Sequence, residues 1–203
     1  MLHLSQTAER KLARDVLHVE LRAEKTGADP QTVEAAINQS MTKALATVRA
    51  TPGVEIATGS YNVYRDAPEK NPPQWTGSQI LSLSGADAGT LLKLGGTLQS
   101  AGLVMSNLGY DVSPGAVRGA EDALTDEALA ALERRGAAIA QQLHLTLLGY
   151  RDLTVGNAGT GEGPLPRMGV AAMTAMPAPV AAPGEATVRV MVSADILLGA
   201  KQP

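Results

Sequence analysis

The residues that could carry out chemistry are few and lie far apart along the chain. Cysteine is absent, which excludes disulfides, thiolate nucleophiles and Cys-based metal sites. The three histidines, His3, His18 and His144, show neither the i, i+4 spacing of a zinc-binding helix nor an H-E-x-x-H motif. No G-x-S-x-G sequence is present to hold a serine nucleophile. We therefore assign no catalytic, cofactor-binding or metal-ligating residue, and we expect a protein that is not an enzyme and uses no cofactor.

Two features of the segment 156–183 could nevertheless bind a ligand. The sequence GTGEG at 159–163 superficially resembles a phosphate loop, but Pro164 and Pro166 prevent the helix that must follow such a loop. The segment also contains thioethers, which are soft ligands that can bind Cu(I) and are equally suited to apolar packing or self-association. The methionines concerned are Met168, Met173 and Met176.

Four acidic residues resemble a catalytic cluster only at first glance: Glu121, Asp122, Asp126 and Glu127. We expect a helix over 126–143 capped by Thr125, which places Asp126 and Glu127 in its first turn. There, negative side chains stabilise the helix by opposing its dipole. The helix dipole therefore explains Asp126 and Glu127 without a catalytic role.

Charge and hydropathy exclude two further classes of function. The formal net charge is −3, and no stretch is rich in Lys and Arg, so the basic face that nucleic-acid binding requires is missing. No apolar run reaches the roughly 20 residues needed to span a bilayer. The residues after Met1 include no apolar segment of a signal peptide. Either the protein is cytosolic, or a signal was removed and Met1 replaces it.

Apolar residues alternate with polar ones in the segments that we expect to form strands. The pattern is clearest at 14–24, where Leu17, Val19, Leu21 and Ala23 should face a core, and it recurs at 187–198. Further strands are expected over 2–12, 54–64, 75–84, 103–112 and 147–155. Gly59 is placed where a bulge could change the buried face.

Three segments carry helical patterns. Asp29 and Pro30 predict the start of a helix that continues to about Val48, and a shorter helix is expected over 87–100. The helix over 126–143 has an apolar stripe that we expect to be buried: Leu129, Leu132, Ile139 and Leu143.

The resulting order is β-β-α-β-β-α-β-α-β-β. Short connections between successive strands favour an α+β fold, with antiparallel sheets and helices segregated to one face. We expect a single domain over residues 1–203, with a long loop rich in Gly, Ala, Pro and Met at 156–183.

In order and character, these segments resemble the SIMPL domain family over nearly the whole chain, from about Leu4 to Leu198. The resemblance is carried by the strand 16–24, the helix 32–48 and the sequences that follow them. These are PGVEIAT at 52–58 with Tyr61 and Tyr64, WTG at 75–77, GL at 102–103 with NLGY at 107–110, the Ala-rich helix 128–143, and PGE at 183–185. At 75–77 the family often has Gly-Tyr instead.

The resemblance implies an exported bacterial protein of poorly defined function, whose signal peptide has been removed and which forms homo-oligomers. We therefore expect a non-enzymatic structural or interaction protein of the periplasm or cell envelope, with an unidentified protein partner. Two alternatives remain open. One is a small-ligand or metal-binding module that uses Met168, Met173 and Met176, and the other is an enzyme with a dispersed site built from loops.

Overall fold

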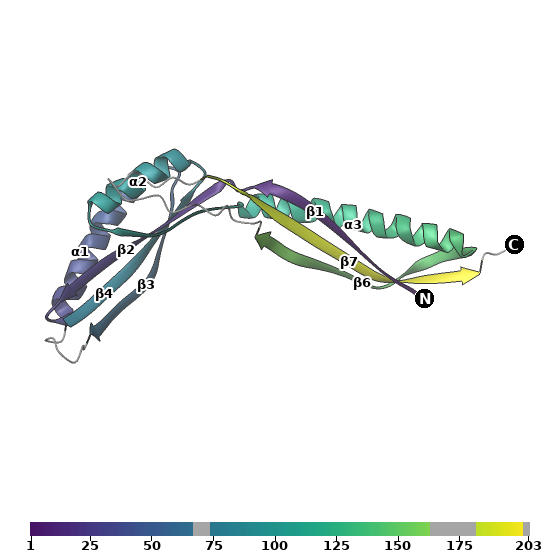
Figure 1. Cartoon of the computed structure of the whole chain (residues 1–203), viewed down its shortest axis with the longest axis horizontal. Coiled ribbons are helices and arrows are strands. Elements are labelled where there is room, and N and C mark those ends of the chain that lie inside the picture. Colours follow the sequence, from purple (N-terminus) through teal and green to yellow (C-terminus); the bar gives the residue numbers. More distant parts are fainter. Residues whose placement is uncertain (67–73, 163–181, 201–203) are drawn as a thin grey trace, which may run out of the picture. The chain divides into compact units, whose positions relative to one another are not determined.

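The computed structural model describes residues 1–66, 74–162 and 182–200. Its helices and strands follow one another in the predicted order, and both sheets are antiparallel (Figure 1). The elements are β1 (Leu2–Ala13), β2 (Val16–Gly27), α1 (Pro30–Arg49), β3 (Glu55–Asp66), β4 (Gln74–Gly85), α2 (Ala88–Ser100), β5 (Val104–Asp111), α3 (Pro114–Gln142), β6 (Leu145–Glu162) and β7 (Glu185–Ala200). The α+β fold class is confirmed.

The chain divides into two compact units. Within the described residues, unit 1 contains 1–14, 112–162 and 184–200, and unit 2 contains 15–111 and 182–183. The expectation of a single domain over 1–203 stays a prediction, because a division by contacts does not test whether the two parts fold separately.

Unit 2 is a four-stranded sheet in the order β3-β4-β2-β5, with α1 and α2 packed against it. The predicted alternation in β2 is confirmed, since Leu17, Val19, Leu21 and Ala23 are fully buried. The bulge expected at Gly59 is also present, because the register between β3 and β4 shifts between Thr58 and Tyr61. Strand alternation therefore gives the sheet one face for the helices and one face for solvent.

Helix α1 begins where the sequence predicts. The backbone N–H and the hydroxyl of Thr32 donate to the two carboxylate oxygens of Asp29, at 2.8 and 2.7 Å. The helix lies close to β4, where a Cβ added to Gly77 would overlap Cδ1 of Ile37 and lie 2.7 Å from Cγ1 of Val33. Gly77 is therefore a packing requirement, because a larger residue would push α1 off the sheet.

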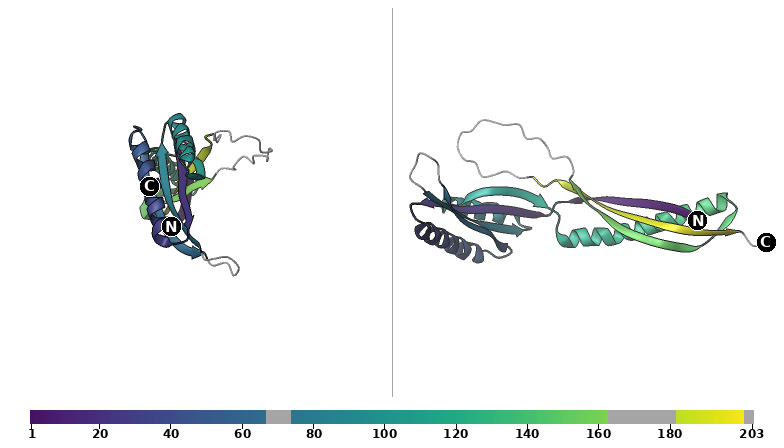
Figure 2. Two further views of the ribbon diagram at one scale, coloured as in Figure 1. Left: turned by 90° about the vertical axis from the view of Figure 1, so that its left-hand side faces the viewer. Right: turned by 90° about the horizontal axis from the view of Figure 1, so that it is seen from below.

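Unit 1 is a three-stranded sheet in the order β1-β7-β6, with α3 along one face (Figures 1 and 2). The predicted inward face of β7 is confirmed, because alternate residues of this central strand are at most 1% exposed: Val188, Val190, Val192, Ala194 and Ile196. Gly136 lets α3 approach closely, since an added Cβ would lie only 2.6 Å from Cδ1 of Ile196.

The start of α3 was predicted wrongly. The helix begins at Pro114 rather than at 126, and the Ser113 hydroxyl caps it by accepting from the backbone N–H of Ala116 at 3.4 Å. Thr125 lies inside the helix, where its hydroxyl donates to the carbonyl oxygen of Glu121 at 2.8 Å. The motif Ser-Pro-Gly at 113–115, which reads as a turn, is here an N-cap followed by proline in the first turn.

The buried face of α3 also differs from the predicted stripe. Of the four residues expected in the core only Leu132 is buried; Leu129 and Ile139 are half-buried, and Leu143 is 56% exposed. The helix instead buries mainly small residues: Ala120, Leu124, Ala128, Leu132, Gly136 and Ala140. Close contact with the sheet favours residues with little side-chain volume over the larger Leu and Ile.

The predicted loop at 156–183 begins too early. Residues 156–162 belong to β6, which pairs with β7 as far as Glu162 opposite Ala186. Pairing along a complete neighbouring strand outweighs the poor strand propensity of this Gly-rich sequence. Residues 163–181 lie outside the described part of the chain.

Candidate functional site

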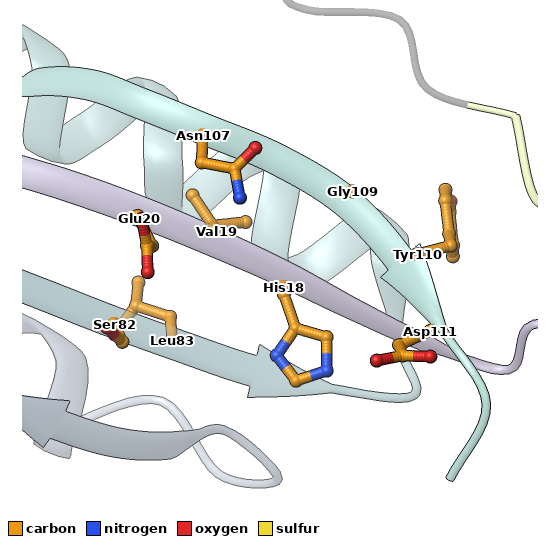
Figure 3. A pocket seen from close by; sticks show the side chains of 9 residues that line it. All are labelled: His18, Val19, Glu20, Ser82, Leu83, Asn107, Gly109, Tyr110 and Asp111. Atoms are coloured by element: carbon orange, nitrogen blue, oxygen red, sulfur yellow. The ribbon is translucent and has the colours of Figure 1, made fainter. Parts of the chain in front are cut away.

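The first candidate surface is a polar hollow on the face of the unit 2 sheet that the helices leave open (Figure 3). It has a volume of about 290 Å³. Gly109 of β5 lies opposite His18 of β2, and because glycine has no side chain, nothing fills the space above it. The other polar groups of this hollow come from three strands: Glu20 of β2, Ser82 of β4, and Asn107, Tyr110 and Asp111 of β5.

The polar groups around this hollow do not form an enclosed reaction centre. His18 and Asn107 are exposed, so the surface does not exclude water. Two hydrogen bonds fix the surrounding strands: Ser106 donates to the carbonyl oxygen of Glu20, and Ser84 donates to the carboxylate of Glu55, both at 3.3 Å. The hollow is therefore suited at most to weak binding of a polar group.

The residues considered from sequence lie on separate elements. His3 of β1 is 2.8 Å from the Asp195 carboxylate of β7, and His144 lies in the turn after α3, whereas His18 belongs to unit 2. Within 1–66, 74–162 and 182–200, no three His, Cys, Asp or Glu side chains are arranged to hold a metal ion. The methionines Met168, Met173 and Met176 lie outside the described residues.

The acidic residues considered from sequence have a different setting from the one predicted. Asp126 and Glu127 lie inside α3 rather than in its first turn, so the helix dipole does not explain them. Glu127 instead lies 3.7 Å from the Arg10 guanidinium of β1, and both side chains are well exposed. An exposed ion pair of this kind contributes little to stability.

The second candidate surface involves β6, an edge strand of the unit 1 sheet. Its pairing with β7 shifts register between Leu147 and Gly149 and again between Arg151 and Thr154. A bulge leaves a residue outside the regular ladder and re-aims its side chain. Here the residues within the shifts include Leu148 and Leu153, which are 67% and 50% exposed.

An apolar groove of about 210 Å³ lies between α3 and β6. We call it the α3–β6 groove, and its lining residues are Leu129, Ala130, Leu132, Glu133, Tyr150 and Leu153. The environment raises the pKa of Tyr150 above its usual value of 10.0, mainly through burial and secondarily through the negative charge of Glu133. Tyr150 therefore presents a neutral phenol beside exposed aliphatic groups.

Sequence reasoning missed this groove. Leu147–Val155 was correctly predicted as part of a strand, but the bulges depend on pairing with β7 and leave no simple signal in one sequence. The available signal was the run Leu147-Leu148 followed by Tyr150 and Leu153, which contains more large apolar residues than a strand with one wet face needs.

Comparison with known families decides where this fold belongs. The model of the family described as SIMPL, protein of unknown function (DUF541), matches residues 2–196. The chain belongs to the SIMPL family. A comparison with curated proteins finds no significant match. None of the helices in the described part of this SIMPL protein has the length and hydropathy needed to cross a membrane.

Proposed function

We propose that this SIMPL protein is a non-enzymatic structural or interaction protein of the cell envelope that acts by self-association. The observation that carries the proposal is the row of large apolar side chains that β6 leaves exposed. Tyr150, Leu153 and Val155 are each 41–50% exposed, and Tyr150 and Val155 lie on the sheet face that carries α3, because they pair with the buried Ile196 and Val192. Such groupings on a protein surface usually mark sites of interaction.

The magnitude of this exposure supports a protein partner. Full burial of a leucine side chain is favourable by about 1.5–3 kcal/mol, so a leucine left half exposed forgoes roughly half of that. Leu153 and Val155, which are 50% and 46% exposed, together therefore leave roughly 1.5–3 kcal/mol that a contact could recover. The hollow at His18 is also lined by apolar residues, but its Val19 and Leu83 are buried, so it offers no exposed leucine to a partner.

Light scattering coupled to size-exclusion chromatography tests self-association directly. The expected result is a mass that is a multiple of the 20.9 kDa chain and falls on dilution. A mass of one chain at every concentration up to about 100 µM, well above the Kd of a specific complex, would overturn the proposal.

The location in the envelope rests on the family resemblance. Its test is the coding sequence upstream of Met1, followed by fractionation of cells that express the natural gene. We expect a signal peptide and recovery in the periplasmic or envelope fraction. A native start at Met1 with recovery in the cytosol contradicts the location and leaves self-association to be judged separately.

A further inference from the structure

We infer that one end of unit 1 docks on a lipid surface that carries negative charge. This end consists of the last turns of α3, the beginning of β6 and the end of β7; we call it the unit 1 tip, residues 134–150 and 196–200. The inference goes beyond the proposed self-association and does not depend on it. It rests on exposed leucines, an apolar hollow and unbalanced positive charge.

Three elements meet at the unit 1 tip. Leu145 of β6 pairs with Ala200 of β7, and α3 ends at Gln142, shortly before β6 begins (Figure 1). The chain passes between the two units at the opposite ends of β1 and α3, after Ala13 and before Pro114. The tip is therefore the end of unit 1 at which unit 2 is not attached.

The tip exposes leucines that unit 1 does not bury. Leu143, in the turn after α3, is 56% exposed, Leu148 is 67% exposed and Leu197 is 40% exposed. Leu197 alternates with the buried Ile196 and so lies on the sheet face away from α3. Leu148 covers Gly199 on the same face, because a Cβ added to Gly199 would lie 2.7 Å from Cδ1 of Leu148.

A hollow of about 550 Å³ adds apolar surface on the other side of the tip, between α3 and the start of β6. Its lining includes the small Ala140, the half-buried Leu145 and Leu147, and the polar groups of Gln141 and His144. Apolar side chains therefore surround the tip instead of forming one flat patch. A fluid lipid surface can accommodate such a distribution, because it requires no matching shape.

Positive charge at the tip is not balanced by acidic residues. The tip contains no Asp or Glu, and Arg134 and Arg135 of α3 are exposed. Neither arginine forms an ion pair within the described part of the chain. Of the acids next to the tip in the sequence, Asp152 contacts Arg151 and Asp195 contacts His3. Lipid headgroups with negative charge would complement these arginines.

The spacing of leucines and arginines fits the layers of a bilayer surface. Arg135 lies seven residues before the end of α3, about 10 Å along the helix axis. Apolar faces of interfacial proteins enter the boundary between headgroups and acyl chains by about 5–10 Å. Leu143 and Leu148 could therefore enter this boundary while the two arginines remain at the level of the headgroups.

Sedimentation of the full chain with lipid vesicles tests the inference. We expect binding to vesicles of equal parts phosphatidylglycerol and phosphatidylcholine to be at least tenfold stronger than binding to phosphatidylcholine alone. The difference should shrink as salt is raised, because salt screens charges at the membrane surface.

Two pairs of variants locate the contact. Leu148→Ser should weaken binding at least fivefold, whereas Met191→Ser should not; Met191 is 46% exposed but lies about 20 Å along β7 from Leu197. Arg135→Gln should weaken binding about fivefold. Its control is Arg118→Gln, an exposed arginine of the same helix about 36 Å from the end of α3. Far-UV circular dichroism must show that all four variants keep the wild-type fold.

A fluorescent label gives a second measurement that does not depend on weakening the contact. Because the chain has no cysteine, Leu148→Cys introduces a single thiol for a dye whose emission depends on polarity. The emission at position 148 should shift to the blue on vesicles that contain phosphatidylglycerol. The same dye on Met191→Cys should not respond.

The outcomes separate this inference from the proposed function. Weaker binding of both Leu148→Ser and Arg135→Gln, with unchanged controls and a blue shift at position 148, supports the unit 1 tip. No binding to the charged vesicles, equal binding to both kinds of vesicle, or equal loss in variants and controls overturns it. Self-association is measured by light scattering without vesicles, so a monomer that binds through the tip contradicts only the proposed function.

Discussion

Replacing Gly136 by Ala tests how closely α3 packs against the unit 1 sheet. In a helix interior this change normally stabilises by about 0.8–1 kcal/mol, because glycine is the more flexible residue when unfolded. At Gly136 the new Cβ would lie 2.6 Å from Cδ1 of Ile196 and 3.4 Å from Cδ1 of Leu147. Carbon atoms prefer about 3.5–4.0 Å, so the shorter contact must open by roughly 1 Å.

Ile196 is fully buried, which prevents its Cδ1 from moving into solvent. Overpacking of this kind costs about 1–3 kcal/mol, so the net effect of Gly136→Ala is a loss of about 0–2 kcal/mol after the helix-propensity gain. The matched control is Gly119→Ala in the same helix, where an added Cβ meets nothing within 4 Å. That variant should gain about 1 kcal/mol, which separates the two variants by about 1–3 kcal/mol.

Urea unfolding followed by far-UV circular dichroism measures both variants. Trp75 is the single tryptophan and lies in β4 of unit 2, so its fluorescence shows whether unit 2 responds when α3 is changed. We expect the circular-dichroism midpoint to fall or stay level for Gly136→Ala and to rise for Gly119→Ala. Equal increases in both would show that α3 does not pack tightly at Gly136, and the reasoning would be refuted.

Three further outcomes follow from the described contacts. Gly77→Ala should destabilise unit 2 by about 1–3 kcal/mol through overlap with α1, measured by Trp75 fluorescence. Hydrogen bonds, first from the backbone of Thr32 and then from its hydroxyl, lower the pKa of Asp29. The resulting stability is present above pH 3.8 and is lost as the pH falls through the folded pKa. Asp29→Asn should therefore make the urea midpoint less dependent on pH in the acidic range. Burial raises the pKa of Tyr150, so the contribution of its neutral phenol to the stability of the fold is present below pH 10 and lost as the pH rises through the folded pKa. The difference in absorbance between the wild type and Tyr150→Phe should place the ionisation of Tyr150 above pH 10.

The sequence was sufficient to predict the structure where the local pattern and the tertiary packing require the same residue types. The alternation in β2 and β7 predicts the faces that are buried, and Asp29 with Pro30 predicts the start of α1. The buried faces of these strands depend only on one neighbouring layer of apolar side chains, so the period of the sequence pattern is enough to predict them.

Prediction failed where the structure depends on distances between elements. Large apolar residues were expected to mark the buried face of α3, but the close approach of helix and sheet selects Ala128, Gly136 and Ala140 instead. The Gly-rich end of β6 was expected to be a loop, but its pairing with β7 makes it a strand. The α3–β6 groove follows from the bulges in that pairing, which is why no spacing in the sequence indicates Leu153 as a contact residue.

The connectivity of unit 1 constrains the order of events during synthesis on the ribosome. β1 leaves the ribosome first, but its only paired neighbour within the described residues is β7, with Ala13 opposite Glu185. At 5–20 residues per second, the roughly 170 residues between them take roughly 10–30 s to make. Throughout that interval β1 lacks β7 as its partner strand, and the three consecutive charged residues Glu9, Arg10 and Lys11 are of the kind that discourages aggregation of an unpaired strand.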